Sequence, residues 1–68
     1  MGVLGHWETI YQASERIRLA TGHKEFTTDN LRSHIESDGC ATKTINGKVY
    51  VNTLYVDKLI YRLGEAGF

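Results

Sequence analysis

The dipeptide Asn46-Gly47 constrains the fold of this chain more than any other feature of the sequence. Both central residues of a type I′ hairpin turn need positive φ, which asparagine and glycine adopt most readily. The turn lies between two runs, 41–45 and 48–52, that are rich in β-branched and aromatic residues and alternate as strands do. The sequence therefore predicts a β-hairpin over residues 41–52.

A helix is predicted on the N-terminal side of the hairpin, from about His6 to Thr21. Apolar residues recur there at helical spacing, whereas most charged residues fall on other sides. Gly22 is placed to end this helix, because glycine adopts the left-handed conformation of a C-cap without a steric penalty. The predicted apolar face consists of Trp7, Ile10, Tyr11 and Ile17, with Ala13 and Ser14 in its middle.

A second, shorter helix is predicted over residues 28–38. A threonine at its start can accept hydrogen bonds from the backbone amides of the first turn. Leu31 and Ile35 lie one above the other on the same face, and Gly39 follows as a stop signal. The connector before this helix is expected to place Phe26 in the core.

The third predicted helix begins after Asn52 or Thr53, either of which can cap it, and runs to about Ala66. Apolar residues recur in it at the i, i+3, i+4, i+7 spacing of one helix face. They are Val56, Leu59, Ile60 and Leu63. The chain then closes on the run Leu63-Gly64-Glu65-Ala66-Gly67-Phe68.

This closing pattern resembles the end of the recognition helix in winged helix-turn-helix DNA-binding domains. The resemblance extends over the last thirteen residues and implies that the third helix contacts double-stranded DNA. In such domains the exposed residues near the start of the helix contact bases. The corresponding residues here are Tyr55, Asp57 and Lys58, together with Tyr61 and Arg62.

The predicted fold class is α+β, a small winged-helix-like domain of three helices with a β-hairpin between the second and third. In a typical winged helix a tight turn joins those two helices, and the wing hairpin follows the recognition helix. The order of elements here therefore departs from the family. A variant with a displaced β-ribbon, a truncated chain without its wing and an unrelated α+β domain all fit this order.

Basic and tyrosine side chains form the predicted nucleic-acid surface. Arginine and lysine can donate to guanine edges or phosphates, and tyrosine hydroxyls contact phosphates. The residues predicted to contact phosphates and base edges are Tyr55, Lys58, Tyr61 and Arg62 on the third helix. Lys43 and Lys48 on the hairpin are predicted to contact only the DNA backbone. The alternatives are an ordinary solvated helix face and strand lysines that discourage edge-to-edge aggregation.

The overall charge is a weaker argument for nucleic acid. The formal net charge is zero, whereas DNA-binding domains usually carry a basic excess. Residues 1–39 hold four basic and six acidic side chains, and residues 40–68 hold four basic and two acidic ones. The C-terminal part, with the hairpin and the third helix, is thus the basic part.

Metal and catalytic sites are not predicted. The soft ligands His6, His23, His34 and Cys40 lack the closely spaced pairs of a zinc site. No glycine-rich phosphate loop or nucleophile motif occurs, and Cys40 is interpreted as a small buried residue. The sequence thus predicts neither an enzyme nor a cofactor.

Length and composition favour a single domain over residues 1–68 in the cytoplasm. One cysteine cannot form an internal disulfide, and this usage fits a reducing compartment. No apolar run approaches the ~18 residues of a membrane span, and no signal peptide is indicated.

A protein–protein interaction module, such as a small phage-type inhibitor or adaptor, is the alternative function. Zero net charge favours it. Trp7 is expected to anchor the first helix in the core; if Trp7 and Phe68 are exposed instead, they would mark a surface for a protein partner or a homodimer.

Overall fold

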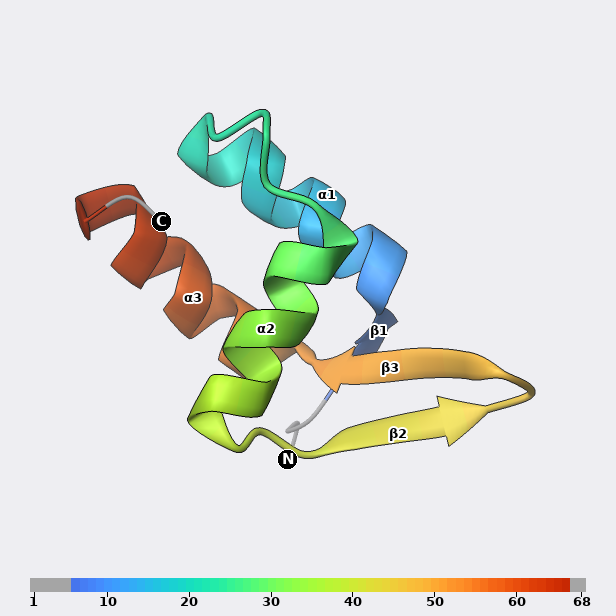
Figure 1. The fold of residues 1–68 in the computed structure, drawn as a ribbon. Helices are drawn as coiled ribbons and strands as arrows, with labels where there is room; N and C mark the ends of the chain where they lie inside the picture. The colour runs from blue at the N-terminus through green and yellow to red at the C-terminus, as the bar shows by residue number, and fades with distance from the viewer. Residues whose placement is uncertain (1–5, 67–68) are drawn as a thin grey trace.

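The structure, a computed structural model, describes residues 6–66. Its fold is α+β, with three helices and a three-stranded antiparallel sheet, and the predicted hairpin between the second and third helices is confirmed (Figure 1). Along the chain the elements are β1 (Trp7–Thr9), α1 (Ile10–Thr21), α2 (Thr28–Asp38), β2 (Thr42–Ile45), β3 (Lys48–Asn52) and α3 (Thr53–Ala66).

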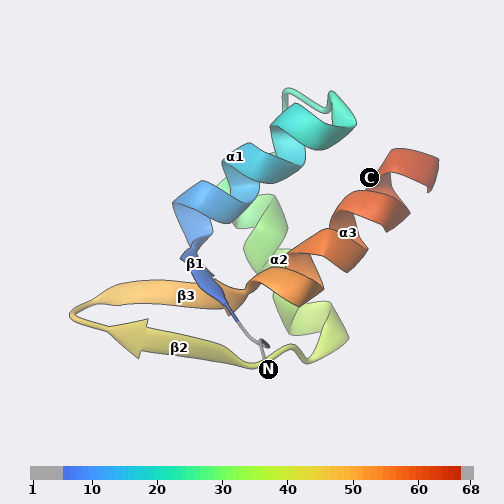
Figure 2. The same cartoon turned by 180° about the vertical axis from the view of Figure 1, so that it is seen from behind.

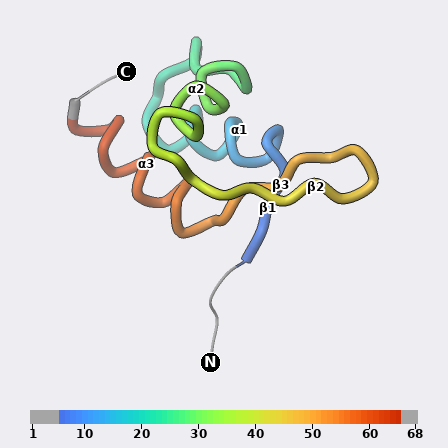
Figure 3. The backbone as a smooth tube through the Cα atoms, turned by 60° about the horizontal axis from the view of Figure 1, so that its bottom comes forward, coloured from blue at the N-terminus to red at the C-terminus, as the bar shows by residue number. Residues whose placement is uncertain are grey.

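The sheet has the strand order β1-β3-β2, so the middle strand is the second arm of the hairpin. Asn46 and Gly47 have φ values of 52° and 79°, as the predicted turn requires. The turn lies on the opposite side of the molecule from α3 in all three ribbon and tube views (Figures 1, 2 and 3). The hairpin therefore forms an arm that projects from the helices.

The N-terminal segment differs from the prediction of a helix beginning at His6. Trp7–Thr9 forms a strand, and α1 begins only at Ile10. The reason is a capping box: the Thr9 hydroxyl accepts from the Gln12 amide at 3.1 Å, and the Gln12 side chain accepts from the Thr9 amide at 3.2 Å. Thr9 is thereby held in an extended conformation, and the residues before it pair with β3.

The expected apolar face of the first helix was also partly wrong. Trp7 belongs to the sheet, where it pairs with Asn52, and it is half-buried. Tyr11 is 78% exposed because the buried side of α1 is centred elsewhere. That side consists of Ile10, Ala13, Ser14 and Ile17. The i, i+3, i+4, i+7 pattern of α1 thus starts at Ile10 and not at Trp7.

The boundaries of α2 agree with the prediction. Thr27 accepts from the Asn30 amide at 3.2 Å, and the Asn30 side chain accepts from the Thr27 amide at 2.9 Å. Gly39 ends the helix with a φ of 66°, in the left-handed region that favours glycine. The start of α3 is likewise capped as predicted, because the Asn52 side chain accepts from the Leu54 amide at 2.7 Å.

The described residues share one hydrophobic core. Phe26 is fully buried in it, as expected from the connector. The core also receives Val51 from the middle strand, while Ile60, predicted to point inward, is half-buried against it. The other buried apolar residues of the helices are Ile10, Ala13, Ile17, Leu31, Ile35, Val56, Leu59 and Leu63. All three helices and the sheet are therefore held by the same cluster.

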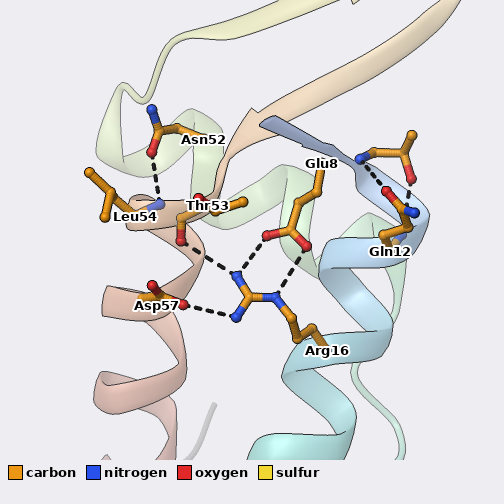
Figure 4. A network of polar contacts seen from close by, with 8 residues as sticks. Glu8, Gln12, Arg16, Asn52, Thr53, Leu54 and Asp57 are labelled. Carbon is orange, nitrogen blue, oxygen red and sulfur yellow. Dashed lines mark hydrogen bonds and ion pairs between the residues drawn. The ribbon is translucent and has the colours of Figure 1, made fainter. Parts of the chain in front are cut away.

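A polar network around Arg16 joins β1, α1 and α3 (Figure 4). The guanidinium donates twice to Glu8, at 2.7 and 3.1 Å, and once to Asp57 at 2.9 Å. The hydrogen bond to Glu8 is the main cause that raises the pKa of Arg16 above its ordinary value. Because the Glu8 side chain is only 11% exposed, these bonds satisfy a carboxylate that the fold has largely removed from water.

Candidate nucleic-acid interface

Two of the four residues predicted on α3 are engaged by the end of α2. The Tyr55 hydroxyl donates to the Asp38 carboxylate at 2.6 Å, and the Arg62 guanidinium donates to the same oxygen at 2.8 Å. The pKa of Asp38 is lowered, mainly by the hydrogen bond from Tyr55 and also by the one from Arg62. The pKa of Tyr55 is raised, mainly by burial and also by its hydrogen bond to Asp38. These two side chains can meet a nucleic acid only by sharing or leaving Asp38.

The other two predicted residues of α3 are more accessible. Lys58 is exposed, and Tyr61 is 74% exposed. Neither makes a hydrogen bond or ion pair within residues 6–66. Asp57, beside them, is held by Arg16. Of the residues predicted on α3, Lys58 and Tyr61 are therefore the two that can bind a partner without first breaking a bond within the protein.

The predicted lysines of the hairpin lie apart from α3. The Lys43 ammonium lies 4.5 Å from the centre of the Trp7 ring, across the sheet from β2 to β1. Lys48 follows the turn, which projects away from α3 (Figure 2). The predicted basic residues of the two elements therefore do not form one continuous surface.

A concave surface does form between α2 and the hairpin. A hollow of about 250 Å³ is lined by Thr28 and Arg32 of α2, by the hairpin residues Gly47, Lys48 and Val49, and by Thr9, Ile10 and Tyr11. A second hollow beside it shares Ile10, Arg32 and Val49, and adds Ser33 and Glu36 among others. Arg32 therefore lies at the middle of this α2–hairpin groove.

Arg32 was not among the predicted site residues. It is exposed, and it makes no hydrogen bond or ion pair with any other residue in the described part of the chain. Its place on the outer side of α2 follows from Leu31 and Ile35 facing the core. That signal was available in the sequence, but nothing local indicated that α2 lies beside the hairpin.

The α2–hairpin groove can hold an anion or the edge of a base. Arg32 can donate in a bidentate manner to phosphate or guanine, and Lys48 supplies a second positive charge from a separate element. Hydroxyls from Thr28 and Ser33 are donors and acceptors, and Glu36 is an acceptor. The groove therefore combines charge with groups capable of reading base edges.

The histidines and the cysteine considered for metal binding and catalysis do not form a common site among the described residues. No group of three or more potential ligands occurs in the described ranges. His34 stacks on Phe26, and a ring nitrogen of His23 lies 3.0 Å from the Leu63 carbonyl oxygen. Burial raises the pKa of the half-buried Cys40 thiol, which favours its protonated, less reactive form.

Within the part of the chain that is described, the helices are too short or too polar to cross a membrane. Comparisons with protein-family models, curated proteins and solved structures find no match to this chain.

Proposed function

We propose that this protein is a DNA-binding module that contacts double-stranded DNA through the α2–hairpin groove. The observation that carries the proposal is the convergence of Arg32 and Lys48, from two separate elements, on one concave surface. In this role the protein acts in the cytoplasm as a regulator of transcription or replication, or as the DNA-binding module of one.

The shapes of the two elements suit a duplex. A helix fits the major groove, where arginine donates to guanine and serine, threonine and glutamate have base partners. A β-ribbon can follow the adjacent phosphate backbone. With α2 in the major groove, the exposed residues Arg32, Ser33 and Glu36, together with the half-buried Thr28, would face the base edges. Lys48 on the projecting hairpin would then reach a phosphate.

The order of elements also favours α2 over α3 as the reading helix. In the winged-helix pattern the hairpin follows the recognition helix, and the helix before this hairpin is α2. The resemblance of the chain's end to a recognition helix suggested α3 instead. Lys58 and Tyr61 remain candidates for additional phosphate contacts, whereas Tyr55 and Arg62 would first have to leave Asp38.

Alanine variants of the two groove cations test the proposal. Binding to a fluorescently labelled random duplex, and then to a selected site, is measured by anisotropy at about 50 and about 200 mM salt. We expect Arg32→Ala to weaken binding to the selected site by about 1–3 kcal/mol and to relax its base preference. Lys48→Ala should weaken binding to all duplexes alike. It should also reduce the slope of log K against log salt concentration by about one, because one phosphate contact is lost.

Lys24→Ala is the matched control, because Lys24 is an exposed cation that does not line the groove. Lys58→Ala tests in the same assay whether α3 contributes. If the two groove variants bind like Lys24→Ala, or the unmodified protein fails to bind duplex at low salt, the proposal is wrong.

A protein–protein interaction module is the second candidate, and the outer side of α3 favours it. Leu54 and Tyr61 are 55% and 74% exposed and lie two turns apart on the same side of that helix. Exposed apolar side chains aligned in this way can pack against a partner helix. Duplex binding that depends on Arg32 would favour the DNA proposal over this one.

A further inference from the structure

The sheet has a second face whose residues point away from the core. Directly paired residues of antiparallel strands lie on the same face, so the face opposite Val51 can be followed from the register. It consists of Trp7, Thr9, Lys43, Ile45, Lys48, Tyr50 and Asn52, which we call the outer sheet face. The cation–π contact between Lys43 and Trp7 confirms that β1 and β2 present these two side chains on one side.

None of these residues is buried. Lys43, Ile45 and Lys48 are exposed, and the other four are half-buried. In contrast, Val51 on the opposite face is fully buried in the core. An antiparallel sheet commonly exposes one face, but such a face is then normally covered by small or charged polar residues. Here it carries two aromatic rings.

The charges of the outer sheet face are of one sign. Its seven residues include two lysines and no acidic side chain, although the chain as a whole is neutral. Glu8, the acidic residue of β1, pairs with Val51 and so belongs to the inner face, where Arg16 holds it. The surface is therefore suited to an anionic ligand.

We propose that the outer sheet face binds single-stranded nucleic acid, with bases stacked on Trp7 and Tyr50 and phosphates bound by Lys43 and Lys48. Aromatic rings interspersed with cations are the means by which proteins bind unpaired bases and their backbone together. A duplex cannot use this face in the same way, because its bases are already stacked and only their edges are accessible. Lys43 leaves the Trp7 ring when a base stacks there and then reaches a neighbouring phosphate.

This surface is distinct from the α2–hairpin groove and does not depend on the proposed duplex binding. Arg32 lines the groove and belongs to a helix, whereas Trp7, Lys43 and Tyr50 belong to the sheet and do not line it. Thr9 and Lys48 border both surfaces and are therefore left out of the test. Variants of the remaining residues can separate the two activities.

Trp7 is the only tryptophan of the chain, so its fluorescence reports directly on this face. The protein is titrated with a thymidine oligonucleotide of about 12 nucleotides, a length in the range that one small domain binds. We expect quenching of Trp7 fluorescence as bases stack on the ring. In a parallel anisotropy titration, Tyr50→Leu should weaken binding about five-fold or more, since one stacked base contributes at least that much. Lys43→Ala should also weaken binding and should reduce its salt dependence, because a phosphate contact is lost.

Two controls keep the result specific. Tyr50→Phe retains the ring and should bind nearly as well as the unmodified protein, and circular dichroism checks that Tyr50→Leu is folded. Arg32→Ala should leave binding of the single strand unchanged while it weakens binding of the duplex. Single-strand binding without duplex binding would support this inference and overturn the proposed function alone.

The inference is overturned if the oligonucleotide neither quenches Trp7 nor changes the anisotropy at low salt. It is also overturned if Tyr50→Leu binds as tightly as Tyr50→Phe, because the ring would then have no role. A third contrary result is equal binding of polyglutamate, which would show a general attraction of anions to the lysines.

Discussion

The arginines of this protein show how the same side chain can be structural or available, depending on its surroundings. Arg16 is bound by two carboxylates from different elements, and Arg62 by one. Arg18 donates to the Phe26 carbonyl at 2.8 Å. Arg32 has no such partner among residues 6–66, so it can bind a phosphate without losing an existing bond. This difference is the reason to expect nucleic-acid contacts from Arg32 before Arg62.

Asp38 has an unusual position for an acidic residue. It is the last residue of α2, where the negative end of the helix dipole disfavours a carboxylate. The hydrogen bonds from Tyr55 and Arg62 compensate for that position and connect α2 to α3. The lowered pKa of Asp38 reflects these two bonds.

The stability of the protein should therefore depend on pH through Asp38. Because its pKa is lower in the folded than in the unfolded state, its contribution is fully present above an unfolded pKa of about 4. That contribution is lost as the pH falls below this value through the folded pKa. Urea unfolding of the unmodified protein and of Asp38→Asn, followed by circular dichroism between about pH 7 and pH 2, measures it.

We expect the difference in unfolding free energy between the two proteins to be largest at neutral pH and to shrink on acidification. The other carboxylates titrate in both proteins and cancel in this difference. If the unfolding free energies of the two proteins differ by the same amount at every pH, protonation of Asp38 has no effect on stability.

At the scale of elements, α2 is the part on which the proposed site depends most. It supplies the core residues Leu31 and Ile35 on one side and the groove residue Arg32 on another. With eleven residues it is too short to be stable as an isolated helix. Its ends are therefore important, and both are defined by local signals, the capping box of Thr27 and the left-handed Gly39.

Removal of the N-cap should weaken the whole domain. We expect Thr27→Ala to lower the free energy of unfolding by about 1 kcal/mol, because the amides of the first turn of α2 lose their acceptor. Denaturant unfolding measures the effect. Thr27→Ser keeps the hydroxyl and serves as the control; equal loss in both variants would mean that the methyl group, and not the cap, is responsible.

At the scale of the whole molecule, neutrality limits how the protein can bind DNA. Eight basic side chains are balanced by eight acidic ones, and the fold already uses Arg16 and Arg62 together with the carboxylates of Glu8, Asp57 and Asp38. Binding cannot rest on a broad basic surface and must use a few well-placed cations.

The salt dependence of duplex binding should consequently be shallow. Two phosphate contacts, for example by Lys48 and one further cation, give a slope of about −2 for log K against log salt concentration. Anisotropy titrations over a series of salt concentrations measure it. A slope near zero would exclude phosphate contacts, and a slope of about −6 or steeper would require a basic surface that the fold does not provide.

The sequence by itself determined the elements whose signals are local. The Asn46-Gly47 turn, the Thr27 cap, the Gly39 stop and the spacing of Leu31 and Ile35 all act over four residues or fewer, so they could be predicted without knowledge of the fold. The start of α1 was signalled in the same way by Thr9 and Gln12, but the apolar Trp7 before it made a longer helix look plausible.

Only the tertiary structure decided which of these elements are neighbours. The strand β1 forms because it pairs with β3, the middle strand of the sheet. The paired residues lie more than forty positions apart in the chain. Asp38 bonds to Arg62 from the end of α2, and Arg32 lines the same hollow as the hairpin residues, because the shared core fixes where α2 lies. Such contacts depend on how whole apolar faces pack together, and no short stretch of sequence encodes them. For that reason the hairpin could be predicted from the sequence, whereas the groove beside it could not.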